Sequence, residues 1–280
     1  MTTGGAGARV LGAVVLAAGL AACGTGDDAP SNLQGYAPEE ILERGNYELE
    51  VQDNPSTALR MFTELERLHP YSEWAQEALI KQAYANHRQE EYDDARAAAQ
   101  RYVELFPTGP DADYATYLIA LSYYDQIEAV GLDQGLTTDA LRALQDVFER
   151  YPDSEYARSA EMKFDLAFDH LAAKEMEVGR YYLRRGHYNA STNRFRTVVE
   201  SFETSTHTPE ALHRLVEAYV ALGLNDEAQT AAAILGHNFR GSEFYDDSYR
   251  LLTGQGLSDE ASGDGWLRDI YRQTVRGDWL

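Results

Sequence analysis

The feature that most constrains the fold of this 280-residue chain is a short pattern that recurs five times. Each copy begins with a small residue and carries an aromatic residue or histidine eleven positions later. Proline follows that residue in three copies, and serine or glycine comes two positions further on in all five. Successive copies start 37, 45, 51 and 37 residues apart, which indicates a chain built from repeated units. The copies begin at Ala58, Ala95, Ala140, Ser191 and Ala228.

Each position of the pattern has a physical role in a pair of helices. Apolar residues recur at three- and four-residue spacing, which is typical of amphipathic helices. The small residue lets two helices approach closely, the proline cannot continue a helix, and the serine caps the next helix. The pattern is similar to the tetratricopeptide repeat, a helix–turn–helix unit that stacks into a solenoid. We therefore predict an all-α solenoid of about five helix pairs over residues 36–253, with a concave face built from the first helix of each pair.

Two of the spacings are too long for a plain repeat. Residues 125–140 are predicted to form an extended loop, and residues 154–186 one unusually long central helix. In the last two copies Glu203 and Arg240 stand where the other copies have proline. The ends of those two helices are therefore less certain from the sequence.

The C-terminal part of the chain lies beyond the last copy of the pattern. Residues 254–265 are expected to form a mobile linker. Residues 266–280 carry an apolar stripe at helical spacing and predict a short helix. This helix either caps the exposed core of the last repeat or docks on a partner. The stripe consists of Leu267, Ile270, Tyr271 and Val275.

The N-terminal residues resemble a bacterial lipoprotein signal. Residues 1–22 hold one charged residue, Arg9, and then an apolar run that is too short to span a bilayer but fits a signal peptide. Cys23, the only cysteine of the chain, follows Leu-Ala-Ala, where lipoproteins are acylated and cut. Residues 23–35 would then form a flexible tether, and Gly24 indicates the periplasmic face of the outer membrane. The alternative is a chance cysteine in a signal peptide that is cut elsewhere.

Charge and motifs exclude several classes of function. The formal net charge of −22 would repel nucleic acid and an anionic bilayer surface. The single cysteine argues against disulfides and metal thiolates, and the seven histidines lack metal-ligand spacing. No phosphate-binding loop or nucleophile motif occurs. We therefore predict that the chain is not an enzyme and takes no cofactor, metal or nucleic acid.

Tyrosines on the first helices predict a binding groove. Tyr47 and Tyr84 occupy equivalent places in repeats one and two, and Tyr117, Leu121 and Tyr124 share one face in repeat three. Aromatic rings on the concave face would suit an extended client peptide that carries aromatic side chains. The alternative is that these rings only fill space between helices.

A local reversal of charge predicts a second interaction surface. Residues 179–196 carry five arginines and no acid in an otherwise acidic chain. Clustered guanidinium groups suit an acidic partner surface. The alternative is that two of them complement a helix C-terminus and the others are solvated. The arginines are Arg180, Arg184, Arg185, Arg194 and Arg196.

Several longer motifs resemble the BamD family, lipoprotein subunits of the outer-membrane barrel-assembly machinery, in its alphaproteobacterial form. The likeness covers about residues 37–252. Its motifs are HPYSEWA (69–75), YLIALSYYDQI (117–127), DQGLT (133–137), KEMEVGRYYLRRGHY (174–188), NRFRTVVE (193–200) and EALHRLVEAYVALGL (210–224).

The resemblance implies a non-enzymatic scaffold. In that family the C-terminal repeats hold the periplasmic domain of the barrel-forming subunit, alongside other assembly lipoproteins. The N-terminal repeats contact unfolded outer membrane β-barrel proteins. Asn193 and Arg194 match the family's position on the helix that meets the barrel-forming subunit. The alternatives are another repeat lipoprotein, such as a pilotin or a cell-wall coordination factor, and a periplasmic hydrolase or its accessory.

Overall fold

The computed structural model describes residues 33–263 and 265–276, so the predicted signal peptide, Cys23 and most of the tether lie outside the described residues. Within those ranges the chain forms helices and no strand, which confirms the all-α prediction there. The helices are α1 Pro38–Glu50, α2 Pro55–Leu68, α3 Glu73–Arg88, α4 Tyr92–Leu105, α5 Ala112–Tyr124, α6 Gly135–Arg150, α7 Ala157–Arg184, α8 Tyr188–Ser201, α9 Thr208–Leu222, α10 Asn225–Asn238, α11 Glu243–Gly254, α12 Trp266–Tyr271 and the π-helical turn η1 Arg272–Arg276.

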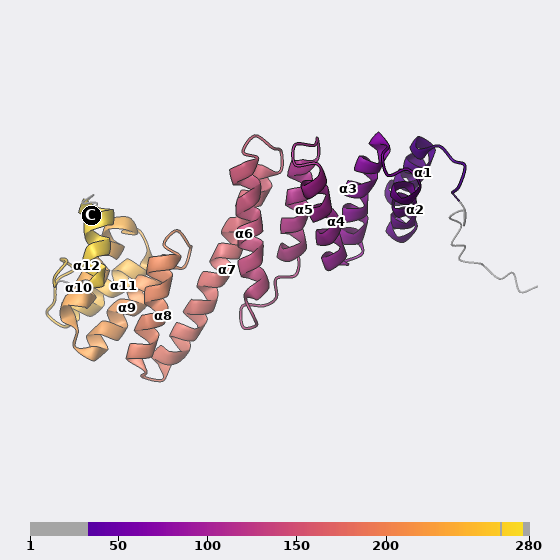
Figure 1. Cartoon of the computed structure of the whole chain (residues 1–280). Helices are drawn as coiled ribbons and strands as arrows, with labels where there is room; N and C mark the ends of the chain where they lie inside the picture. The colour runs from indigo at the N-terminus through magenta and orange to yellow at the C-terminus, as the bar shows by residue number, and fades with distance from the viewer. Residues whose placement is uncertain (1–32, 264, 277–280) are drawn as a thin grey trace, which may run out of the picture. The chain divides into compact units, whose positions relative to one another are not determined.

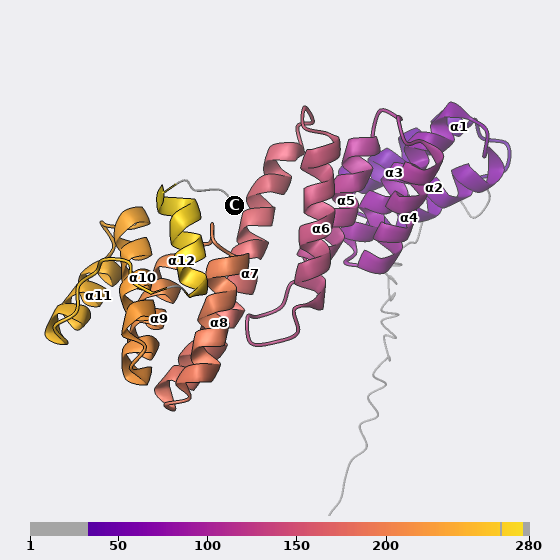
Figure 2. The ribbon, with the colours of Figure 1, turned by 60° about the vertical axis from the view of Figure 1, so that its left-hand side comes forward.

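Helices that follow one another in the sequence pack side by side from α1 to α10 (Figures 1 and 2). The first helices of successive pairs, α1, α3, α5, α7 and α9, also contact one another, whereas α2, α4, α6, α8 and α10 do not. This is the packing of tetratricopeptide repeats, and the five predicted pairs are confirmed. Helix α11 packs against α9 as a further first helix.

The second helix of each pair ends with the same backbone geometry, whether or not proline follows. At the end of α6, α8 and α10 the capping residue has φ between −133° and −128° and donates its N–H to the carbonyl four residues back. Phe202 and Phe239 also pack against the core, and their carbonyls accept from the serine N–H three residues later at 2.9 Å. The partly buried aromatic residue and this bond end the helix, so Glu203 and Arg240 do not disturb it.

The predicted serine caps are confirmed at two junctions and wrong at two others. The hydroxyl oxygens of Ser72 and Ser242 accept from the third backbone N–H that follows, at 3.2 and 3.3 Å. Ser154 accepts from the N–H of Tyr156 at 3.1 Å, before α7 begins, and donates to Asp113 at 2.6 Å, and the Ser205 hydroxyl lies 3.3 Å from that of Thr208. Helices α7 and α9 begin three residues after these serines, so the hydroxyls are used in the turns.

Small residues let the paired helices approach closely. The small first residues of the five repeated segments are all fully buried. Two glycines outside the pattern also allow a close approach; each lies on the first helix of its pair. A Cβ on Gly45 would lie 2.4 Å from the ring of Phe62, and one on Gly179 would lie 2.5 Å from the ring of Phe195. Repeats one and four therefore share a glycine–phenylalanine contact.

The two long spacings are explained by one long helix and one loop. The predicted long helix over residues 154–186 is confirmed as α7, which has 28 residues and begins three residues later and ends two residues earlier than predicted. The loop is shorter than the predicted 125–140, because α6 already begins at Gly135. Gln134 starts that helix: its carbonyl accepts from the N–H of Thr138 at 3.1 Å, and its side-chain oxygen accepts from the Thr137 hydroxyl at 3.2 Å.

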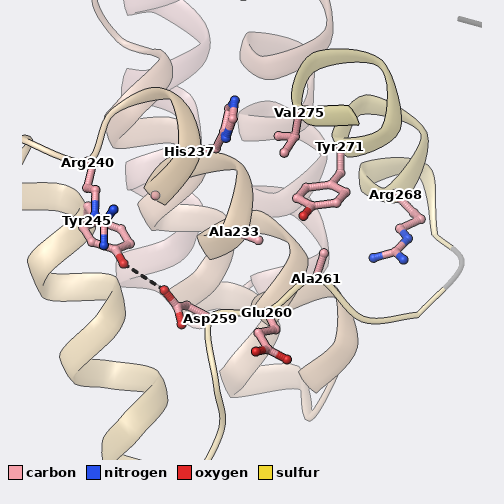
Figure 3. A pocket seen from close by; sticks show the side chains of 11 residues that line it. Ala233, His237, Arg240, Tyr245, Asp259, Glu260, Ala261, Arg268, Tyr271 and Val275 are labelled. Carbon is pink, nitrogen blue, oxygen red and sulfur yellow. Dashed lines mark hydrogen bonds between the residues drawn. The ribbon is translucent and has the colours of Figure 1, made fainter. Parts of the chain in front are cut away.

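The segment after α11 runs along α10. Ser262 donates from its hydroxyl to Asp226 at 2.7 Å, and its N–H donates to Thr230 at 3.0 Å. The hydroxyl of Tyr245 donates to Asp259 at 2.8 Å (Figure 3). These contacts join the segment to α10 and α11. Its predicted mobility stays a prediction.

Helix α12 covers the end of the last repeat. Leu267 is buried in the core formed by α7 to α11. The Trp266 indole N–H donates to the Tyr219 hydroxyl at 3.1 Å, and the Arg196 guanidinium lies 4.7 Å from the Trp266 ring centroid. Of the two alternatives for this helix, the structure therefore shows the cap.

One buried histidine predicts a dependence of stability on pH. Nδ1 of His213 in α9 lies 2.8 Å from the hydroxyl of Ser248 in α11. Burial lowers the pKa of His213, although the nearby Glu217 carboxylate acts in the opposite direction. Because the folded pKa is below the unfolded one, the unfolded chain binds more protons. The stability is therefore complete above the unfolded pKa of about 6.5 and is lost as pH falls through that value toward the folded pKa.

We expect the free energy of unfolding to fall between pH 7.5 and 5.5 by at most about 1.4 kcal/mol per pH unit from this residue. Urea unfolding followed by circular dichroism at both pH values measures it. His213→Gln should reduce the pH dependence, whereas His187→Gln, at an exposed position, should leave it unchanged. An equal pH dependence in the His213 variant would contradict this assignment.

Candidate protein-interaction surfaces

The structure does not bring the five residues of the predicted client-peptide groove together. Tyr117 is 8% exposed, and its hydroxyl lies 2.7 Å from that of Ser159 in α7. Leu121 packs between two core clusters, and Tyr124 lines a separate small cavity with Ile127. Placing Tyr117 in an open groove is therefore wrong, because α7 covers it, and Leu121 serves packing.

The other two predicted tyrosines, Tyr47 and Tyr84, lie in different surroundings. Tyr47 is 51% exposed on α1, and its hydroxyl accepts from Gln52 at 2.7 Å. It does not line any of the described cavities. Tyr84 is half-buried on α3 and does line a large cavity. Tyr84 is thus the one predicted residue that the structure places in an aromatic cavity near the N-terminal pairs.

That cavity, here called the aromatic groove, has a volume of about 830 Å³ and opens on the first helices of the repeats. Its walls come from α1, α3, α5 and the residue before α7. Four aromatic side chains and one isoleucine supply the apolar surface, and four carboxylates and one lysine surround it. The lining residues are Glu50, Glu73, Trp74, Gln76, Glu77, Ile80, Lys81, Tyr84, Pro110, Asp111, Tyr114 and Tyr156.

Buried groups hold the walls of the groove in place. The fully buried Tyr102 accepts from Gln76 at 2.9 Å and from the N–H of Asp111 at 3.2 Å, which fixes both lining residues. The ring of Tyr156 lies 5.0 Å from that of Tyr114 and stacks on that of Tyr117 at 5.2 Å between centroids. Burial raises the pKa of Tyr114, with the neighbouring tyrosines and Asp111 acting in the same direction. Its phenol therefore stays neutral at physiological pH.

Two residues of the aromatic groove, Trp74 and Tyr156, were not predicted, although the sequence contained a signal for both. Trp74 and Tyr156 both stand two positions after the serine of a repeat junction, as does Phe244 in the last repeat. An aromatic residue at this place lies at the start of a first helix: Trp74 is in the first turn of α3, and Tyr156 directly precedes α7. At these two junctions, after α2 and after α6, this position lines the aromatic groove.

The arginine cluster is dispersed and partly neutralised in space. Arg180 donates to Glu210 of α9 at 2.9 Å, and Arg194 donates to Glu175 of α7 at 3.1 Å. Arg196 bonds Glu200 at 2.8 Å and faces α12. The partners belong to other turns or helices, so the acid-free stretch of sequence is not an acid-free surface.

Three exposed residues of the predicted barrel-subunit interface are not paired with a carboxylate in the described part of the chain. Arg184 and Arg185 end α7, are exposed, and have no carboxylate partner within residues 33–263 and 265–276. Arg185 stacks on the Tyr181 ring at 4.5 Å. Asn193 is exposed on α8, next to Arg194. We call Arg184, Arg185, Asn193 and Arg194 together the cationic edge of the α7–α8 pair.

A second cavity lies beside the terminal cap and carries balanced charge. It has a volume of about 490 Å³ and lies between α10, α12 and the segment before α12 (Figure 3). Arg240 and Arg268 face it together with Asp259 and Glu260. Equal numbers of both signs give it no preference for a charged partner.

Within the described part of the chain, no cluster of three potential metal-ligating side chains occurs. None of the helices there combines the length and the apolar character that crossing a bilayer requires.

Five stacked helix pairs define a tetratricopeptide-repeat protein. A sequence profile of the YfiO family, described as "Outer membrane lipoprotein", matches residues 35–234. The chain belongs to this family.

Two relatives agree with that assignment. A protein of Caulobacter vibrioides named "Outer membrane protein assembly factor BamD" is 43% identical over 250 residues, 89% of this chain and 82% of that protein. A protein of Rickettsia prowazekii with the same name is 40% identical over 184 residues, 66% of this chain and 73% of its own length. Among solved structures, a thermophilic tetratricopeptide-repeat protein of Thermus thermophilus gives a TM-score of 0.37 at 19% identity over 79% of this chain and 100% of that one.

Proposed function

We propose that this chain is a non-enzymatic scaffold of the outer-membrane β-barrel assembly machinery, attached by lipid on Cys23 to the periplasmic face of the outer membrane. The names of its relatives support the assembly role. The observation that carries the scaffold role is the aromatic groove on the first helices, a site suited to binding polypeptide and without a reactive constellation.

In this proposal the two ends of the repeat array have different partners. The aromatic groove of the N-terminal pairs receives unfolded outer membrane β-barrel proteins, whose strands carry aromatic side chains at the membrane interfaces. The cationic edge of α7–α8 binds an acidic patch on the periplasmic domain of the barrel-forming subunit, next to other assembly lipoproteins. Exposed guanidinium groups suit such a patch because they bind carboxylates bidentately.

The alternative is another tetratricopeptide-repeat lipoprotein, such as a pilotin or a cell-wall coordination factor. Such a protein would share the helix pairs and the lipid anchor. The long helix α7 and the loop before Gly135 match the assembly family instead, as the motifs in these segments indicate. We therefore favour the assembly role.

Charge reversal at Arg194 tests the barrel-subunit interface. Arg194 is paired only with Glu175 on the surface, so Arg194→Glu places two carboxylates side by side and repels an acidic partner. We expect its affinity for the purified periplasmic domain of the barrel-forming subunit to fall about tenfold at low salt and less at high salt. Isothermal titration calorimetry measures both values.

Arg142→Glu is the matched control, because Arg142 pairs with Asp139 on the exposed surface of α6. It carries the same charge change outside the proposed interface and should leave the affinity unchanged. Both variants should keep the circular dichroism of the unmodified chain. An Arg194 variant that binds as well as the control removes Arg194 from the interface.

A further inference from the structure

The charges around the aromatic groove are unequal. Glu50 is the only one of its four carboxylates with a cationic partner among the described residues, since it pairs with Lys81 at 3.1 Å. Glu73, Glu77 and Asp111 have none. Asp111 accepts a neutral hydrogen bond from Tyr102 at 3.3 Å. The groove therefore presents a net negative field to whatever enters it.

These carboxylates stand next to aromatic faces. Glu73 and Trp74 are consecutive in the first turn of α3, and Glu77 follows one turn later on the same helix. Across the groove, Asp111 immediately precedes α5, which carries Tyr114. An ammonium or guanidinium group is attracted by the face of an aromatic ring and by a carboxylate. A groove that offers both favours a cationic side chain over a neutral or anionic one.

We propose that the aromatic groove selects extended, unfolded polypeptide segments in which a lysine or arginine lies next to aromatic residues. This inference rests on the proposed role of the groove in receiving clients and names the feature that it recognises. The apolar part of the walls holds the aromatic side chains, and Glu73 and Glu77 hold the cation. An acidic segment is repelled by the same carboxylates.

The test uses the full chain in detergent and three peptides of about ten residues, the length of one membrane-spanning strand. The peptides share alternating aromatic and polar residues and differ only at one central position, which is Lys, Gln or Glu. We expect the Lys peptide to bind about three- to tenfold more tightly than the Gln peptide, and the Glu peptide to bind most weakly. The difference should shrink as salt is added.

A double variant tests whether Glu73 and Glu77 cause the preference for the Lys peptide. Glu73→Gln with Glu77→Gln should remove most of the preference for Lys while the Gln peptide binds as before. The matched control is Glu39→Gln with Glu43→Gln, which changes the charge by the same amount on exposed positions of α1 outside the groove. It should keep the preference.

The outcomes separate this inference from the client role itself. If all three peptides bind equally and Trp74→Ala weakens all of them, the groove binds clients but charge selection is wrong. If the Lys preference persists in the Glu73 and Glu77 variant, the proposed carboxylates are wrong. If none of the peptides binds, both the client role and the selection are contradicted.

Discussion

Replacing Phe195 with alanine is expected to lower the free energy of unfolding by about 3–5 kcal/mol. Phe195 is fully buried and is among the largest fully buried side chains. Its ring lies against Gly179, which has no side chain that could move into the space left by the ring. The cavity would therefore persist between α7 and α8, in the core that also holds α9 to α12. Chemical denaturation followed by circular dichroism measures the loss.

The matched control for this substitution is Leu105→Ala at the end of α4. Leu105 is 59% exposed, so its truncation removes little buried surface and should change stability by no more than about 0.5 kcal/mol. Equal losses from both substitutions would contradict the close packing of the fourth helix pair. Because repeat arrays are stabilised by contacts between neighbours, the loss from Phe195 should also loosen the terminal cap.

Replacing Cys23 with serine is expected to release the chain from the membrane. Cys23 lies outside the described residues, and the prediction rests on the lipoprotein signal around it. One acyl chain gives only marginal membrane binding, whereas two or more hold a protein stably. A chain without any acyl group and with a net charge of −22 has no remaining attraction to an anionic surface. We expect its membrane-bound fraction to fall at least about tenfold.

Fractionation of the envelope after overexpression measures this release, and Thr25→Ser in the predicted tether serves as the control. The control should remain in the outer membrane fraction. Retention of the Cys23 variant in that fraction would show that lipid is not what holds the chain there. Mass spectrometry of the mature N-terminus then identifies whether the thiol is acylated.

The helix pairs were predictable from the sequence because their signals are local. A small residue and an aromatic residue eleven positions later set the close approach and the end of each second helix, and the structure repeats that ending at all five places. The long helix α7 was predictable for the same reason, since no proline interrupts it and Gly179 is an isolated glycine within the helical pattern.

The interaction surfaces were less predictable because they depend on which helices meet. Arg180 is neutralised by Glu210, which lies thirty residues later in the sequence. Tyr117 lies on α5, but the residue before α7 and α7 itself bring Tyr156 and Ser159 over it. The aromatic groove likewise joins residues from three successive first helices and the start of a fourth. Such juxtapositions follow from the stacking of repeats and cannot be read from one repeat alone.

Affinity purification of the tagged, full-length chain from solubilised envelopes, followed by mass spectrometry, tests the proposed scaffold role in barrel assembly. We predict that the large barrel-forming subunit is the main co-purifying protein and that its yield drops in the Arg194→Glu variant. A pilus secretin or a cell-wall synthase as the main partner, with the barrel-forming subunit absent, would contradict the assembly role.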